Sequence, residues 1–228
     1  APTYDPEFVE SYEFGFKFNS ANGKFTLNGA MFYADYTEIQ LETIDPNGGI
    51  APQLKNSGTA EIKGFELETM WYPVERLQLM FNITLNDGKI DEFIDNQVTI
   101  ADTSVPPAAG CGRADLTFIQ VDSCPNDRSD ENLPRLPEQT YYVAAEYTFD
   151  TPIGQVLPRV QFSYKSDVDY CFDSASCRSG LWLEDEQRDL SARVTWLSTN
   201  EKWVGAIYGN NLTDEDYIMR LQREEAES

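Results

Sequence analysis

The sequence predicts an all-β fold in which about eight antiparallel strands follow one another up and down. Three observations predict it. Apolar and polar residues alternate with a period of two in eight separate segments, which is the pattern of a strand with two different faces. No apolar stripe with helical spacing and comparable length occurs. The links between the alternating segments are short and long in turn.

The first four segments carry the strongest alternation. Residues 12–18 place an aromatic side chain at every second position, and in residues 25–33 Phe, Leu, Gly, Met and Tyr alternate with Thr26, Asn28 and Ala30. Residues 65–71 have an apolar face opposite two glutamates. Residues 77–86 are the clearest case, because five apolar residues alternate with Gln, Met, Asn, Thr and Asn. Each segment therefore predicts a strand.

The last four segments continue the pattern. Residues 140–149 combine Tyr, Val, Ala and Phe on one face, and residues 159–164 alternate Val, Phe and Tyr with Arg, Gln and Ser. Residues 190–196 alternate Leu, Ala, Val and Trp with Ser, Arg and Thr. Residues 202–210 are ambiguous, because apolar side chains occupy both sets of positions. We expect a strand in each range.

The links indicate which kind of β fold this is. Short turns, most of them with Asn-Gly, Pro or Gly, are expected at 19–23, 72–76, 150–154 and 197–201. Links of about 18, about 50 and about 18 residues begin at Gln40, Gly88 and Cys171. Loops longer than ~12–15 residues are uncommon in compact domains. Transmembrane β-barrels, in contrast, combine short periplasmic turns with long extracellular loops.

Tryptophans support the barrel interpretation. Trp71, Trp196 and Trp203 all lie beside short turns, where a membrane-interface girdle is expected. The strands are also long enough, since ~9–11 tilted residues cross a bilayer. The polar residues of each strand would then line a wet interior. We therefore predict a segment of an antiparallel, up-and-down transmembrane β-barrel.

Charge excludes several classes of function. The 228 residues contain 39 Asp and Glu, 17 Lys and Arg and no His, so the formal net charge is -22. Nucleic acid is not an expected partner, because phosphate binding needs a basic face. The absence of histidine excludes Ser-His-Asp and Cys-His catalysis and the commonest zinc ligand. The acidic residues are concentrated in the long links, with ten acidic and four basic side chains in 88–138.

The four cysteines lie in two of the long links. Cys111 and Cys124 occur in one, and Cys171 and Cys177 in another. Their spacings fit poorly to zinc sites, which usually use tighter pairs. Disulfides in an oxidising compartment are favoured, although four cysteines allow three pairings.

A second fold and function remain open from the residues alone. Glu66 and Glu68 lie two apart on one strand face, which places their side chains ~7 Å apart. That separation is within the range of an inverting glycosidase pair. The alternative is therefore a secreted, soluble β-sandwich that binds or hydrolyses glycans. In a barrel the same two residues would be an acidic pair that lines the interior.

Two acidic segments resemble cation sites only superficially. Residues 86–92 match part of a calcium loop, but Ile83, Leu85 and Ile94 occupy three of its ligand positions. We expect a turn at the end of a strand there. Residues 184–186, Glu-Asp-Glu, are expected to be solvated loop acid.

Three motifs carry a family resemblance. Residues 60–68, Ala-Glu-Ile-Lys-Gly-Phe-Glu-Leu-Glu, precede a Trp-Tyr-Pro turn and resemble a mid-barrel signature of TonB-dependent outer-membrane receptors. Residues 133–138, Leu-Pro-Arg-Leu-Pro-Glu, are similar to the family's late-barrel entry. Residues 208–217 resemble its Asn-Leu-x-Asp-x-x-Tyr segment. The motif residues expected to be structural are Gly64, Glu66, Asn210, Asn211, Asp214 and Tyr217.

The resemblance implies a 22-stranded barrel closed by a plug, which imports a scarce ligand such as a ferric siderophore, haem, cobalamin or a glycan. We expect residues 1–228 to form only part of that barrel domain, with the plug, the earlier strands and the final strand absent. The partners implied are the remaining barrel and plug, outer-membrane lipid and, through the plug, a TonB-type energy-coupling protein. The implied location is the bacterial outer membrane.

Ligand capture in such receptors is done by extracellular loops together with the plug. The loop aromatics that could contact the ligand are Phe93, Phe118, Phe172 and Trp182. A packing role is the alternative for each. No catalytic residue, cofactor or metal ligand is expected.

Overall fold

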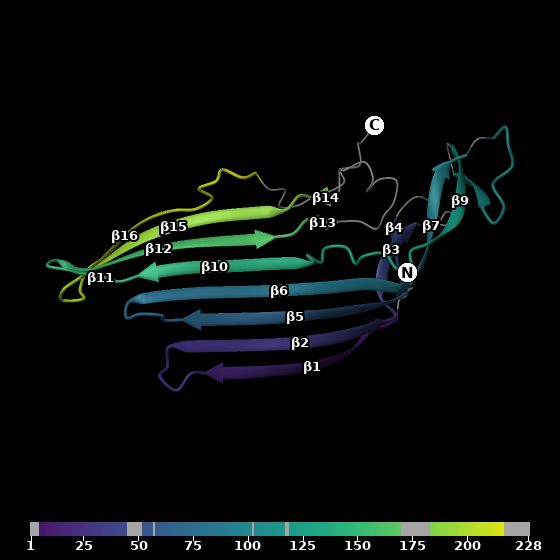
Figure 1. The fold of residues 1–228 in the computed structure, drawn as a ribbon. Helices are drawn as coiled ribbons and strands as arrows, with labels where there is room; N and C mark the ends of the chain where they lie inside the picture. The colour runs from purple at the N-terminus through teal and green to yellow at the C-terminus, as the bar shows by residue number, and fades with distance from the viewer. Residues whose placement is uncertain are drawn as a thin grey trace.

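The computed structural model describes residues 5–44, 52–56, 58–101, 103–116, 119–169 and 183–216. Its centre is one antiparallel sheet in which eight strands follow the order β1-β2-β5-β6-β10-β12-β15-β16, with β11 paired to β12 (Figure 1). Each strand of this main sheet pairs with the main-sheet strands before and after it in the chain, so the topology is up and down. β1 and β16 form its two edges.

The main-sheet strands have the following bounds: β1 Phe8–Asn19, β2 Phe25–Thr37, β5 Thr59–Trp71, β6 Leu77–Glu92, β10 Gln139–Tyr147, β11 Phe149–Thr151, β12 Gly154–Lys165, β15 Gln187–Ser198 and β16 Val204–Gly209. Every one of the eight predicted strands lies in this sheet, and the all-β, up-and-down prediction is confirmed. Only 140–149 is divided, at Thr148, between β10 and β11. The register also resolves the ambiguous last strand, because Ile207 pairs with Val194 on the apolar face and Tyr208 pairs with Arg193 on the polar face.

The prediction of a turn at residues 86–92 is wrong. β6 continues to Glu92 and pairs with β5 as far as Thr59, with a register shift between Thr59 and Ala60. Asp87, Lys89 and Asp91 continue the alternate positions that are apolar in residues 77–85, and they are charged, so the apolar alternation stops at Leu85 although the strand continues. β6 therefore extends beyond its apolar part, which ends at Leu85.

Two of the short turns share one hydrogen-bonding scheme. In 20–25 the Ser20 amide donates to the Phe25 carbonyl at 2.8 Å, and the Lys24 amide donates to Asn22 Oδ1 at 3.1 Å. In 198–203 the Ser198 amide donates to the Trp203 carbonyl at 2.9 Å, and Lys202 donates to Asn200 Oδ1 at 3.1 Å. Both turns read Ser-x-Asn-x-Lys-aromatic. The asparagine closes each turn through its side-chain oxygen.

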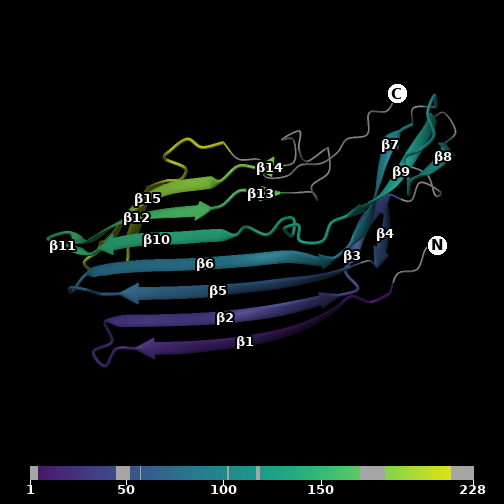
Figure 2. The same cartoon turned by 45° about the vertical axis from the view of Figure 1, so that its right-hand side comes forward.

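The long links hold small sheets of their own. A hairpin joins β3 (Gln40–Ile44) to β4 (Pro52–Asn56), and a three-stranded sheet has the order β7-β9-β8 (Ile94–Ile100, Ile119–Asp127, Gly112–Leu116). A two-residue pairing joins β13 (Val168–Asp169) to β14 (Leu183–Glu184). β3 lies against β7, and these elements gather at the end of the main sheet opposite the short turns (Figure 2). We call the two ends the long-link end and the short-turn end.

The main sheet forms a single layer (Figures 1 and 2). The soluble β-sandwich alternative is therefore wrong for the part of the chain that the structure describes, because no second large sheet covers either face. Large apolar side chains remain exposed, including Phe14 at 68% and Met31 at 56%. In residues 5–44, 52–56, 58–101, 103–116, 119–169 and 183–216, no helix is long and apolar enough to cross a membrane.

Candidate functional site

The two faces of the main sheet have opposite chemistry. Residues that are directly opposite each other on paired strands share a face. One row of such residues is Phe14, Met31, Phe65 and Leu85, and the matching row on the other face includes Ala30, Glu66, Thr84 and Thr140. We call them the apolar face and the polar face. The alternation predicted from the sequence therefore becomes two continuous surfaces.

The apolar face is a band of constant height. On β5 it extends from the charged Lys63 to Trp71, and on β15 from the charged Arg188 to Trp196. Eight residue steps correspond to roughly 26 Å along a strand. With the ~40° tilt of membrane barrels, the band covers ~20 Å, close to the ~25 Å apolar band of such barrels. Trp71 and Trp196 lie at the short-turn limit, as an interfacial girdle requires.

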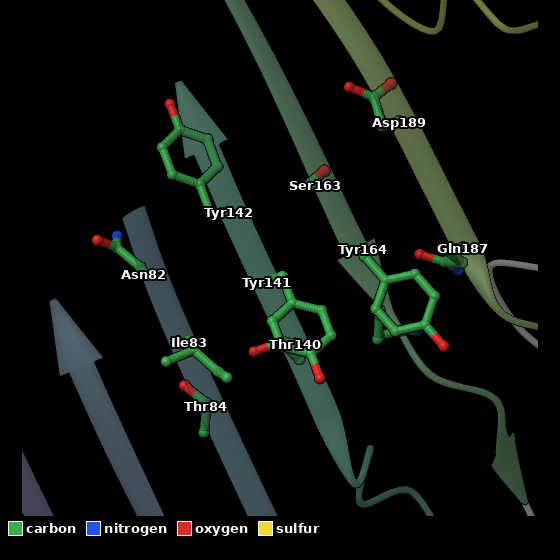
Figure 3. Close-up of a pocket in the computed structure, with 11 residues that line it drawn as sticks. Asn82, Ile83, Thr84, Thr140, Tyr141, Tyr142, Ser163, Tyr164, Gln187 and Asp189 are labelled. Carbon is green, nitrogen blue, oxygen red and sulfur yellow. The ribbon is translucent and has the colours of Figure 1, made fainter. Parts of the chain in front are cut away.

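A cavity of about 450 Å³ opens over β6, β10, β12 and β15 (Figure 3). Residues of both faces line it: Ile83, Tyr141 and Tyr164 are on the apolar face, and eight residues form two rows of the polar face. One of these rows contains Asn82, Tyr142, Ser163 and Asp189, and the other Thr84, Thr140, Lys165 and Gln187. The eight polar-face residues carry hydroxyl, amide, phenol, ammonium or carboxylate groups. Such a lining can exchange hydrogen bonds with a polar solute or with another polar segment of chain.

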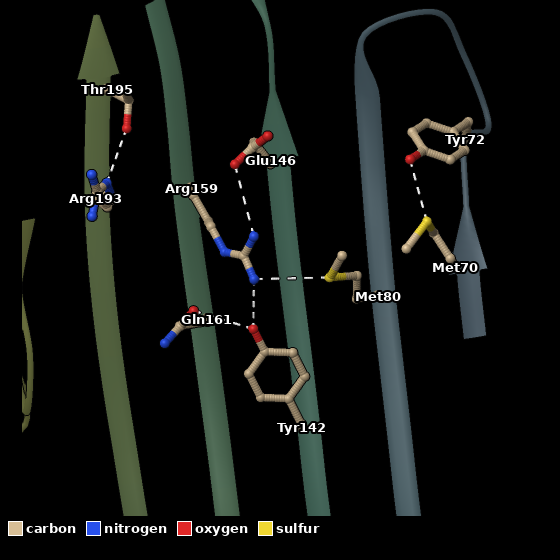
Figure 4. A network of polar contacts seen from close by, with 9 residues as sticks. All are labelled: Met70, Tyr72, Met80, Tyr142, Glu146, Arg159, Gln161, Arg193 and Thr195. Atoms are coloured by element: carbon tan, nitrogen blue, oxygen red, sulfur yellow. Dashed lines mark hydrogen bonds and ion pairs between the residues drawn. The ribbon is translucent and has the colours of Figure 1, made fainter. Parts of the chain in front are cut away.

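A charged network lies next to this cavity on the short-turn side (Figure 4). Arg159 Nη2 donates to Tyr142 Oη at 2.7 Å, and Nη1 is 3.9 Å from Glu146 Oε2. Tyr142 Oη in turn donates to Gln161 Oε1 at 3.2 Å. Arg193, opposite Arg159, donates to Thr195 Oγ1 at 3.0 Å. Sequence reasoning assigned arginine to the interior but could not identify these partners.

Glu184 is not the solvated loop acid that the sequence indicated. Its side chain is 3% exposed, and Lys165 Nζ lies 3.1 Å from its Oε2. Gln187 Nε2 also donates to Glu184. The ion pair connects the end of β12 to β14, just before β15 begins, beside the cavity. A buried carboxylate of this kind needs its cation.

The base of the longest link contains the largest fully buried side chains among the described residues. Ile90 and Phe93 are 1% and 2% exposed, and the guanidinium of Arg128 is almost fully buried beside them. Arg128 Nη1 donates to Glu131 Oε1 at 3.2 Å, and the Arg128 amide donates to the Phe93 carbonyl at 2.8 Å. Phe93, one of the predicted ligand contacts, is thus buried at the base of the link. Phe118, Phe172 and Trp182 lie outside the described residues.

The late-barrel entry motif, residues 133–138, packs against the end of β6 that leads into the longest link. The Leu133 amide donates to the Gly88 carbonyl at 3.0 Å, and the Asn86 amide donates to the Glu138 carbonyl at 2.8 Å. The side chain of Leu136 lies where a Cβ on Gly88 would be. Residues 133–138 therefore run along the extension of β6 before β10 begins.

Asn211 forms two hydrogen bonds within the turn that follows β16. Its Oδ1 accepts from the Glu215 amide at 3.0 Å, and its Nδ2 donates to the Glu215 carbonyl at 2.8 Å. The Asn211 amide donates to Asp189 Oδ2 at 3.0 Å, which ties the turn to β15. Asn211 and Asp214 both have positive φ, 48° and 58°. Asn210 follows directly after β16, and Tyr217 lies outside the described residues.

Glu66 and Glu68 lie on the polar face between β2 and β6. Glu66 pairs with Ala30 and Thr84, and Glu68 with Asn28 and Asn82. Asn28 Nδ2 donates to Glu68 Oε2 at 3.4 Å. The structure thus places both carboxylates in the predicted interior.

Gly64 allows a close approach of strands and rings. A Cβ at this position would lie 2.7 Å from the Leu85 carbonyl oxygen and would overlap the Phe32 ring. We predict that Gly64→Ala destabilises the full-length protein by about 2 kcal/mol, because the backbone must shift. Chemical unfolding in detergent micelles measures the change. Gly112→Ala, where a Cβ meets no atom within 4 Å, is the matched control and should be neutral; equal effects would contradict the prediction.

One of the predicted disulfides is present. Cys111 and Cys124 are bonded, and they close a loop of sequence separation 13 next to the β8–β9 ladder. Cys171 and Cys177 lie outside the described residues.

Removal of this disulfide should destabilise only the β7-β9-β8 sheet. The double change Cys111→Ser with Cys124→Ser should reduce local stability by about 2 kcal/mol, the low end of the usual range, because strand pairing already restrains the loop. Hydrogen exchange of amides 119–127 should accelerate roughly thirtyfold. Amides of β12 serve as an internal control, and acceleration there as well would show that the effect is global.

Comparisons with known proteins identify the class. The fold is a stretch of up-and-down barrel wall, with one apolar and one polar face. The chain belongs to the TonB-dependent receptors: the family model "TonB dependent receptor-like, beta-barrel" matches residues 1–217. No curated protein matches the sequence.

Solved structures show the same fold. The ferric yersiniabactin uptake receptor of Yersinia pestis is 17% identical, with a TM-score of 0.67 over 96% of this chain and 27% of that one. The ferric-catecholate import receptor of E. coli K12 is 16% identical, with a TM-score of 0.61 over 94% and 24%. A siderophore receptor of Acinetobacter baumannii is 16% identical, with a TM-score of 0.61 over 92% and 25%. The chain spans about a quarter of the length of these structures.

Proposed function

We propose that residues 1–228 are part of the barrel wall of an outer-membrane receptor that imports a ferric siderophore. Family membership over residues 1–217 is the observation that carries the proposal. The ligand class is suggested by the similar structures, which include a ferric yersiniabactin uptake receptor and a siderophore receptor. The exposed apolar band meets lipid, and the polar face lines the interior. The chain itself catalyses no reaction.

The remainder of such a receptor supplies further parts. The other strands close the barrel, a plug fills it, and a TonB-type protein delivers energy through the plug. In this arrangement the long-link end faces outward, because long loops of outer-membrane barrels are extracellular. Phe118, Phe172 and Trp182 remain candidate ligand contacts in those links.

Growth under iron limitation tests the ligand. Deletion of the gene for the full-length protein should abolish growth on one class of ferric siderophore, and the wild-type gene should restore it. Uptake of radioactive iron from that siderophore should also disappear when the energy-coupling protein is deleted. Unchanged uptake with every siderophore class would overturn the ligand assignment.

Fractionation tests the location independently. The full-length protein should require detergent for extraction from the outer-membrane fraction. Recovery in the soluble fraction without detergent would overturn the membrane assignment.

A further inference from the structure

The turn between β1 and β2 contains the dipeptide Asn22-Gly23, at the short-turn end of the main sheet (Figure 1). In an Asn-Gly dipeptide the glycine nitrogen can attack the asparagine side chain with little obstruction, because glycine has no Cβ. The attack forms a cyclic succinimide and releases the side-chain amide as ammonia. Three such dipeptides occur in the sequence, at 22–23, 28–29 and 47–48, and the last lies outside the described residues.

The side-chain carbonyl of Asn22 is held by two donors. Its Oδ1 accepts hydrogen bonds from Ser20 Oγ at 2.8 Å and from the Lys24 amide at 3.1 Å. When a nucleophile adds to Cγ, this oxygen becomes negatively charged, and hydrogen bonds to a charged acceptor are stronger than those to a neutral one. The two donors are therefore placed to stabilise the tetrahedral intermediate, as in an oxyanion hole.

The attacking nitrogen is accessible. A Cβ on Gly23 would meet no atom within 4 Å, and both Asn22 and Gly23 are exposed. The Gly23 amide donates to the Ser20 carbonyl at 2.8 Å. In an exposed turn such a bond opens at little cost in free energy. Water and base can then reach the freed nitrogen.

The same dipeptide at 28–29 lies within β2. Gly29 pairs with Phe16 of β1 and with Leu67 of β5, so its backbone is held between two strands. A Cβ on Gly29 would lie 2.5 Å from the Phe16 ring, which covers this glycine. Ring closure needs backbone rotation, and a residue in the middle of a sheet gains that freedom only by larger unfolding. Asn28 should therefore be protected.

The turn between β15 and β16 provides a second comparison. Asn200 Oδ1 accepts from Ser198 Oγ at 2.9 Å and from the Lys202 amide at 3.1 Å, as Asn22 does in the first turn. The next residue is Glu201, whose φ of 56° is close to the 67° of Gly23. The two turns thus hold the asparagine alike and differ in the residue that supplies the attacking nitrogen.

We propose that Asn22 is a site of spontaneous deamidation. The Gly23 nitrogen loses its proton to base in the solvent and forms a bond to Asn22 Cγ, while the Cγ–Nδ2 bond breaks and ammonia leaves. Water then adds to either carbonyl of the succinimide, and the ring opens to aspartate or isoaspartate. Both products add a negative charge beside Lys24. The reaction needs water alone and does not depend on the proposed function.

Peptide mapping of the full-length protein measures the reaction. The protein is incubated in detergent at mildly alkaline pH and analysed by mass spectrometry, with digestion in heavy-oxygen water to mark any conversion that occurs during digestion. Asn22 should convert to aspartate and isoaspartate at least about tenfold faster than Asn200 or Asn28. An unconverted Asn22, or conversion of either comparison residue at the same rate, would overturn the proposal.

Exchange of the following residue between the two turns tests the cause. Gly23→Glu should slow the conversion of Asn22 by about tenfold or more, and Glu201→Gly should accelerate that of Asn200 by a similar factor. Glutamate should be accommodated at position 23, because Glu201 already adopts a positive φ in the same kind of turn. Rates that do not follow the glycine would overturn the proposal.

Ser20 tests the part played by the donors. Ser20→Ala removes one of the two donors to Asn22 Oδ1 and should slow conversion by roughly fivefold, whereas Ser20→Thr keeps a hydroxyl and should change the rate little. Faster conversion in Ser20→Ala would show that the turn protects Asn22, and it would overturn the role given to the donors.

Discussion

Replacement of Arg128 by alanine should open the base of the longest link. The guanidinium is 3% exposed and 3.2 Å from Glu131, and its neighbours Ile90 and Phe93 are buried. Removal of one partner of a buried ion pair costs about 3–5 kcal/mol, and we expect the low end here because Glu131, which keeps its charge, is 25% exposed and is partly solvated. The change should also leave space beside Phe93. Residues 90–93 and 128–131 should therefore open locally without unfolding the main sheet.

Native-state hydrogen exchange of the full-length protein measures the local opening of residues 90–93 and 128–131. Amides 90–93 should exchange at least a hundredfold faster in Arg128→Ala, whereas amides of β12 should not change. Arg128→Lys should recover only part of the protection, because an ammonium group cannot reproduce the planar fork. Wild-type exchange at Ile90 in the alanine variant would contradict the structural role.

The second large effect concerns Lys165 and Glu184. Lys165→Met should cost about 3 kcal/mol, the low end of the range for a broken buried pair, because Lys165 is 31% exposed and Glu184 is only 3% exposed. The double variant Lys165→Met with Glu184→Gln should be more stable than Lys165→Met alone, since no buried charge is left unpaired. A thermodynamic cycle of the four proteins, by chemical unfolding, gives the coupling free energy. Additive effects would show that the pair is not coupled.

The strands of the main sheet could be predicted from the sequence because the alternation that identifies each strand is a local pattern. A strand with lipid on one side and polar groups on the other must alternate, and the eight segments from 12–18 to 202–210 do so. The failure at 86–92 follows from the same rule: beyond the lipid, outward residues become charged, and a strand then resembles a loop. The shared Ser-x-Asn-x-Lys turns could have been found by comparing 20–25 with 198–203, since their signal lies in the sequence itself.

The polar contacts could not be predicted in this way. Lys165 and Glu184 are 19 residues apart, and Arg159 and Tyr142 are 17 apart, so each pair depends on strand register. Phe93 was assigned to a loop from its position after a charged segment, yet the extension of β6 carries it into a small core. The register of the strands and the continuation of β6 to Glu92 both depend on contacts between residues far apart in the chain, and a single sequence contains no direct signal for either.

The extension of β6 has a mechanical consequence. β5 and β6 remain paired from Lys63–Asp87 up to Thr59–Glu92, about five residues beyond the apolar band, or roughly 16 Å. A hydrogen-bonded pair of strands of that length resists bending and acts as a rigid support. In an outer membrane it would hold the disulfide-closed β7-β9-β8 sheet well above the lipid headgroups. An antibody directed at that sheet would then reach its epitope on a living cell without approaching the bilayer.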